Sequence, residues 1–198
     1  MNKKILFVII AVVLLGGGVF AWQYLKMLNI EETIETRVYF SNFLKETEDG
    51  YPEIRCEIVY PVIRVIPKTE AVIEATINEL LKGPTEEEKN QGYLSNIPDI
   101  EEVERYSSYQ HTYYGWAGWW ACDGEKFPFR KGRVALLDLN IKDGIAFADF
   151  SGEIHTYGGG SCRVDAIRSQ ITNTLKQFLV IEEVVISVDG EKECILQP

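Results

Sequence analysis

The sequence predicts a small α+β domain: a sheet of about five strands with two helices packed on one face, preceded by one N-terminal transmembrane helix. Three observations predict this architecture. Short β-branched segments alternate with two amphipathic segments in the order β-β-α-β-β-α-β. The 198 residues are 46% hydrophobic and 12% aromatic, which is enough material for one core. A long uncharged stretch, residues 5–25, also lies near the N-terminus.

Residues 1–26 are expected to form a membrane anchor. The uncharged run, residues 5–25, would span about 30 Å as a helix, which is the thickness of the hydrocarbon core of a bilayer. Two lysines precede the run and acidic residues follow it, so the positive-inside rule places the domain outside the cytoplasm. The alternative is a signal peptide cleaved after Ala21, which would release a secreted domain. Both alternatives export the domain.

A short linker, residues 27–36, is expected to lead into a domain over residues 37–198. The stretch "TRVYFSNF" predicts a first strand, and an acidic loop with Gly50 and Pro52 follows it. The stretch "CEIVYPVIRVIP" predicts a second strand, rich in β-branched residues and interrupted by prolines, which suit an edge strand or a bulge.

The first helix is predicted over residues 70–82, "EAVIEATINELLK". Its apolar residues recur at helical spacing, Thr69 is a candidate N-cap, and Gly83 followed by proline ends the pattern. Directly afterwards, Thr85 and Glu88 have the spacing of a capping box and Gly92 is a stop signal, so a short helical turn is expected there.

The next segment, residues 100–132, is rich in aromatic residues and has no clear period. Such a local concentration indicates either a lobe packed on itself or a surface for a ligand. Trp119 and Trp120 are the best candidates for a contact patch because small residues flank them. In the alternative interpretation the rings cap the core. The candidate binding residues are Tyr113, Tyr114, Trp116, Trp119 and Trp120.

The C-terminal part predicts a hairpin, a helix and a strand. Two apolar runs meet at Asp143-Gly144, a dipeptide typical of tight hairpin turns. "GGGSCRVDAIRSQITNTLKQF" follows, with glycines that act as a hinge and an apolar stripe at helical spacing. "EEVVISVDG" predicts the last strand.

The composition opposes several classes of function. The formal net charge of −10 opposes nucleic-acid binding, because that affinity comes largely from basic side chains. The sequence contains no HExxH, GxSxG or Walker motif. Cys162 and Arg168 have the spacing of cysteine phosphatases, but the glycines precede the cysteine, so we expect no catalytic residues.

The four cysteines, Cys56, Cys122, Cys162 and Cys194, indicate two disulfides in an exported domain. The residues alone leave three pairings open, as well as the alternative of buried free thiols. A zinc site built from His111, Cys122, His155 and Cys162 lacks the close ligand spacing of zinc knuckles and ribbons. We therefore expect no metal and no cofactor.

Two stretches resemble the GerMN domain, a sporulation and spore-germination module of exported envelope proteins. They are "YPVIRVIPKTEAVIEATINELLKGPTEEEKNQGYLSNIP" and "DGIAFADFSGEI…GGGSCRVDAIRSQITNTLKQFLVIEEVVISVDG". The resemblance implies a compact α+β fold similar to ring-building motifs, a non-catalytic role and an extracytoplasmic location. The aromatic insertion departs from the family, which usually has a short connection there.

The resemblance also implies one disulfide, because cysteines matching Cys56 and Cys162 occur in members of the family. Cys122 and Cys194 are then left for the second. The function expected from the resemblance is a membrane-anchored, extracytoplasmic module for protein interaction or envelope assembly, including self-assembly. The alternative is a module that binds cell-wall glycan through the tryptophans of the insertion. A role in sporulation itself is not implied.

Overall fold

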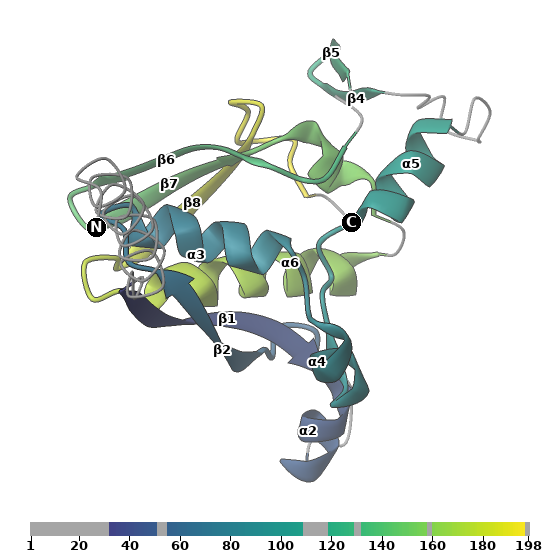
Figure 1. Ribbon diagram of the computed structural model, residues 1–198. Helices are drawn as coiled ribbons and strands as arrows, with labels where there is room; N and C mark the ends of the chain where they lie inside the picture. The colour runs from purple at the N-terminus through teal and green to yellow at the C-terminus, as the bar shows by residue number, and fades with distance from the viewer. Residues whose placement is uncertain (1–31, 51–54, 109–118, 129–131, 158–159, 197–198) are drawn as a thin grey trace, which may run out of the picture.

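The computed structural model describes residues 32–50, 55–108, 119–128, 132–157 and 160–196. Within these residues, two three-stranded sheets lie on opposite sides of a pair of long helices (Figure 1). The α+β class and the order of the seven main elements are confirmed.

The first sheet has the strand order β2-β1-β3 and is antiparallel. It consists of β1 (Thr33–Asn42), β2 (Tyr60–Pro67) and β3 (Tyr93–Leu94). Alternate residues of β1, including Val38 and Phe40, are fully buried against the helices. Strand β1 begins at Thr33, which pairs with Pro67, so the end of the predicted linker belongs to the strand.

The second sheet has the order β6-β7-β8. Its strands are β6 (Leu136–Lys142), β7 (Ile145–Phe150) and β8 (Glu183–Val188). The predicted hairpin turn is confirmed: Asp143 and Gly144 both have positive φ, at 51° and 79°, as a type I′ turn requires. Strand β8 runs parallel to β7, and the connection between them contains the second long helix.

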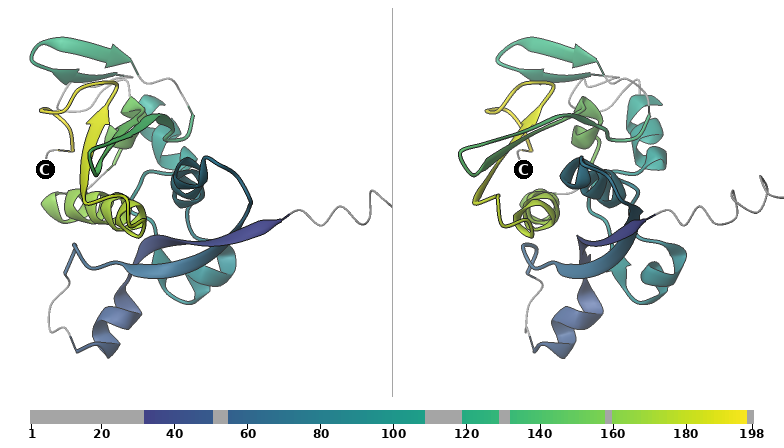
Figure 2. Two further views of the ribbon diagram at one scale, coloured as in Figure 1. Left: turned by 90° about the vertical axis from the view of Figure 1, so that its left-hand side faces the viewer. Right: turned by 60° about the vertical axis from the view of Figure 1, so that its left-hand side comes forward.

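The two long helices are α3 (Val72–Leu81) and α6 (Ser161–Lys176). Helix α6 buries two stripes of side chains. One is apolar and belongs to the core: Val164, Ile167, Ile171 and Leu175. The other contains Gln170 and Thr174, continues into Gln177, and faces β1. Burial on more than one side places α6 inside the domain, between the two sheets (Figure 2).

The prediction of one five-stranded sheet with both helices on one face is wrong, because the polar stripe of α6 occupies the second edge of β1. The N–H of Arg37 donates to Gln177 Oε1 at 2.9 Å, and Gln177 Nε2 donates back to the carbonyl of Arg37 at 2.5 Å. The N–H of Tyr39 donates to Thr174 Oγ1 at 3.2 Å. These side chains take the place of a neighbouring strand, so β1 does not pair with β6, β7 or β8.

The remaining elements are short. They are α2 (Phe43–Glu48), α4 (Glu86–Asn90), α5 (Ile100–Ser108), β4 (Trp119–Cys122), β5 (Glu125–Pro128) and the 3₁₀ turn η1 (Gly152–His155). The capping box of Thr85 and Glu88 is confirmed at the start of α4. The prediction that Thr69 caps α3 is wrong: its hydroxyl accepts from the N–H of Ala71, and Ala71 itself is the N-cap residue.

The predicted membrane anchor, residues 1–26, lies outside the described residues. Among the helices of the described ranges, none is long and apolar enough to cross a bilayer.

Candidate interaction site

The aromatic insertion contains a helix and a hairpin. Helix α5 occupies its first part, and β4 and β5 form a hairpin near its end, with Trp119 paired to Pro128 and Trp120 to Phe127. In both views of Figure 2 the hairpin lies at the outer end of the domain, beyond the β6-β7-β8 sheet. Of the predicted binding residues, Trp119 and Trp120 form the start of β4, whereas Tyr113, Tyr114 and Trp116 lie outside the described residues.

A disulfide ties this hairpin to the domain. Cys122, at the end of β4, is bonded to Cys194, which follows β8, with a Cα–Cα distance of 5.3 Å. Cys122 is buried, and β4 lies against η1. Asp123 lies close to both sulfur atoms, but the two sulfurs are bonded to each other. The bond fixes the base of the hairpin.

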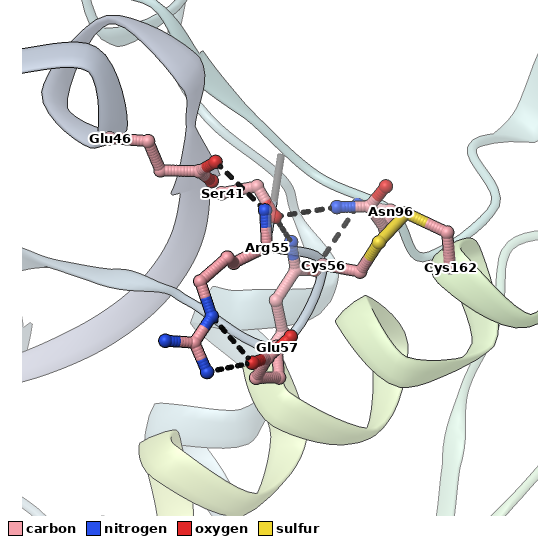
Figure 3. Close-up of a disulfide and its surroundings, with 8 residues drawn as sticks. Ser41, Glu46, Arg55, Cys56, Glu57, Asn96 and Cys162 are labelled. Carbon is pink, nitrogen blue, oxygen red and sulfur yellow. Dashed lines mark hydrogen bonds and ion pairs between the residues drawn. A yellow bond between two sulfur atoms is a disulfide. The ribbon is translucent and has the colours of Figure 1, made fainter. Parts of the chain in front are cut away.

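The second disulfide joins the loop before β2 to the first turn of α6, as Figure 3 shows. Cys56 and Cys162 have a Cα–Cα distance of 5.1 Å. Beside them, Asn96 Nδ2 donates to Ser41 Oγ at 2.8 Å. Arg168, the other residue of the phosphatase-like spacing, donates to the carbonyl of Ile195 at 3.0 Å. Cys162 and Arg168 therefore both hold the fold together in this structure.

A groove of about 540 Å³ lies where the two ends of the insertion meet the rest of the domain. Its walls are the end of α3 with the turn after it, the loop from β3 into α5, and single side chains from α4, α6 and the segment before β6. The lining residues are 81–84 and 94–102, together with Lys89, Arg133 and Arg163.

Arg163 of α6 holds one wall of the groove in place. Its guanidinium binds both carboxylate oxygens of Glu102 on α5, at 2.7 and 2.6 Å, and Nε donates to the carbonyl of Asn96 at 2.9 Å. Because a two-pronged pair with a carboxylate fixes orientation as well as distance, Arg163 sets the position of α5 relative to α6. Gln170 adds a second link, since its Nε2 donates to the carbonyl of Leu94 at 3.1 Å.

The surface of the groove is chemically mixed. Leu94 and Ile100 are exposed apolar side chains within it. Lys82 and Lys89 form ion pairs with glutamates one helical turn away, and Arg133 is exposed near the same opening. A surface with apolar contacts and charges of both signs, held on a fixed backbone, suits a peptide segment better than a uniformly charged ligand.

The 3₁₀ turn η1 carries a largely buried histidine beneath the hairpin. Burial lowers the pKa of His155 from 6.5 to about 4, and the nearby Asp189 carboxylate opposes this shift only in part. His155 is therefore neutral at physiological pH. His111, the other histidine of the zinc hypothesis, lies outside the described residues.

Helix α5 and the groove beside it are not among the features predicted from the sequence. A signal for the helix was present: Asp99 and Glu102 have capping spacing directly after Pro98, and the N–H of Glu102 donates to Asp99 Oδ1 at 2.9 Å. The role of Arg163 had no comparable local signal, because Glu102 lies 61 positions away.

Known proteins provide an independent comparison. A family model described as sporulation and spore germination matches residues 128–194. No curated protein matches the chain. Among solved structures, the tandem GerMN domains of the sporulation protein GerM from Bacillus subtilis are similar to 81% of this chain, with a TM-score of 0.50 and 21% identity. That match covers 41% of the tandem chain, less than half of its length.

Two further structures are similar at lower scores. The first GerMN domain of the same Bacillus subtilis protein has a TM-score of 0.49 and 20% identity, over 80% of this chain and 85% of that one. A putative lipoprotein from Clostridium perfringens has a TM-score of 0.35 and 17% identity, over 82% of this chain and 78% of that one. The family-model match over residues 128–194 and the fold shared with the tandem structure support a GerMN-type domain in this chain.

Proposed function

We propose that this chain is a membrane-anchored, extracytoplasmic and non-catalytic module that binds a segment of a protein partner in the cell envelope. The observation that carries the proposal is the groove beside the insertion. It combines exposed apolar side chains with charges of both signs, and its walls are fixed by hydrogen bonds from α6.

The fixed walls favour binding of a flexible partner. Arg163 and Gln170 together hold α5 and the loop before it. A binding surface that is already ordered loses less conformational entropy on association, so more of the contact energy contributes to affinity. One disulfide fixes the start of α6, directly before Arg163, and the other fixes the base of the hairpin.

The proposed location follows from the first residues of the chain. Residues 5–25 carry no charge and are long enough to span a bilayer, and lysines on their N-terminal side favour an external domain. A partner would then be met outside the membrane, on the envelope side.

Photo-crosslinking in cells tests the proposal. A photoreactive residue at Leu94, which is 60% exposed inside the groove, should yield a discrete crosslinked product with a partner protein. The matched control position is Val65 on β2, which is 62% exposed and outside the groove. The Leu94 product should disappear when Ile100, the other exposed apolar residue of the groove, is changed to Asp.

Equal products at Leu94 and Val65, or a product that persists in the Ile100→Asp variant, would show that the groove is not the binding site. The glycan alternative predicts a different result. In that case the purified protein sediments with peptidoglycan, and changing Trp119 and Trp120 to Ala abolishes sedimentation.

A further inference from the structure

The turn between α6 and β8 exposes two aliphatic side chains. Leu179 is 100% exposed and Val180 is 61% exposed, whereas Ile181 beside them is buried in the core. The flanking contacts fix this turn, since the N–H of Ile181 donates to the carbonyl of Phe178 at 2.9 Å. The domain therefore presents a defined apolar tip, consisting of Leu179 and Val180.

The apolar tip lies at the end of the domain where the chain enters β1. Along α6, Thr174 bonds to Tyr39 and Gln177 bonds to Arg37, so α6 runs antiparallel to β1. Residues after Gln177 are therefore level with the first residues of β1. The turn between β6 and β7 is at the same end, because the N–H of Glu182 donates to the carbonyl of Gly144 at 2.7 Å. In Figure 1 both turns and the start of β1 lie at the left-hand end of the domain; Figure 2, in which this end faces the viewer, shows the start of β1 on the right of it and the two turns on the left.

The chain before β1 brings this end close to the proposed membrane anchor. Six residues, 27–32, separate Lys26 from Thr33. Fully extended, the seven Cα–Cα steps from Lys26 to Thr33 reach at most about 25 Å. If residues 5–25 span the bilayer, the end of the domain that bears the tip must therefore stay near the lipid surface.

We propose that Leu179 and Val180 insert into the interfacial region of the bilayer and so orient the domain on the membrane. The proposal rests on the anchoring proposed above. Two aliphatic side chains give weak membrane affinity by themselves, but a short tether makes the contact intramolecular, at a high effective concentration. With the tip in contact with the lipid, the groove and the hairpin would lie on the distal part of the domain.

The surrounding charges indicate apolar rather than electrostatic contact. Three acidic residues lie near the tip: Glu182 and Glu183 follow it, and Asp143 lies in the adjacent turn. The basic residues beside the same two turns are Lys142 and Lys176. This excess of acidic groups does not favour anionic headgroups. The contact should therefore form on zwitterionic lipid, and added anionic lipid should not strengthen it.

An environment-sensitive fluorophore at position 179 tests the contact. The full chain carrying Leu179→Cys is labelled with NBD and reconstituted into phosphatidylcholine vesicles. We expect a blue-shifted emission that is quenched by phosphatidylcholine bearing a nitroxide on its acyl chain. The control probe is Phe43→Cys, which is 60% exposed and directly follows the far end of β1. It should keep the emission of a fluorophore in water and lose none of it to the quencher.

Resistance to alkaline extraction separates the two proposals. If the chain resists extraction and the two probes behave alike, the lipid contact is refuted while the anchor stands. If alkaline washing releases the chain, the anchor is wrong and the lipid contact falls with it.

Because a new thiol can interfere with disulfide formation, hydrogen exchange at Ile181 provides a second measurement. In the wild-type protein, the backbone N–H of Ile181 should exchange more slowly in vesicles than in detergent. The unlabelled double variant Leu179→Ser, Val180→Ser should lose this difference, and a difference that persists in the variant refutes the contact.

Discussion

Protonation of His155 should destabilise the folded domain as the pH falls below 6.5. The imidazole is largely buried in η1, and burial disfavours its charged form, so its pKa in the folded domain is about 4. In the unfolded chain the same group regains a pKa of about 6.5. Between these two values the unfolded state binds a proton that the folded state does not, so the free energy of unfolding decreases as the pH falls.

The size of the effect follows from the difference between the two pKa values. Each unit corresponds to about 1.4 kcal/mol, so the full loss is about 3 kcal/mol, reached only below pH 4. At pH 5, about 2 kcal/mol of this should already be lost. The largest change is expected between pH 6.5 and pH 4, because above 6.5 the imidazole is neutral in both states.

Urea unfolding of the full chain in mild detergent, followed by tryptophan fluorescence at pH 7.5, 6 and 5, measures the effect. Carboxylates also titrate near the lower end of this range, so the informative quantity is the difference between the wild-type protein and His155→Gln. The variant should be less sensitive to pH by about 2 kcal/mol at pH 5. Parallel profiles for the two proteins would refute the assignment of a buried, neutral imidazole.

Three further outcomes are expected. Gln177→Ala leaves the N–H and carbonyl of Arg37 without their side-chain partner and should lower the free energy of unfolding by about 1–2 kcal/mol. The control, Asn173→Ala on the exposed face of α6, should change it little in the same urea titration. Arg163→Met should cost about 2–3 kcal/mol and increase hydrogen exchange in α5; unchanged exchange would show that this pair does not position the helix. Changing both Trp119 and Trp120 to Ala should leave the melting temperature nearly unchanged, and the glycan alternative predicts that it weakens binding to the wall; if the variant unfolds instead, the two rings belong to the core.

Most local structure could be predicted because its causes lie within a few residues. The capping box joins Thr85 to Glu88 across three positions, and the hairpin turn needs two residues that tolerate positive φ, supplied by Asp143 and Gly144. The apolar stripe of α6 repeats at helical spacing. The disulfide pairs did not follow from spacing, and the expectation of Cys56 with Cys162 came from the resemblance to GerMN domains.

By itself, then, the sequence determined the α+β class, the order of the main elements and the turns between them. Only the tertiary structure decided that the strands form two sheets, because that depends on Gln170, Thr174 and Gln177 bonding to residues more than 70 positions away. The groove has the same origin: five separate parts of the chain form it, and Arg163 reaches across 61 positions to hold α5. Local conformation is set by hydrogen bonds between near neighbours, whereas the choice among possible partners for a polar side chain is made only when the core packs.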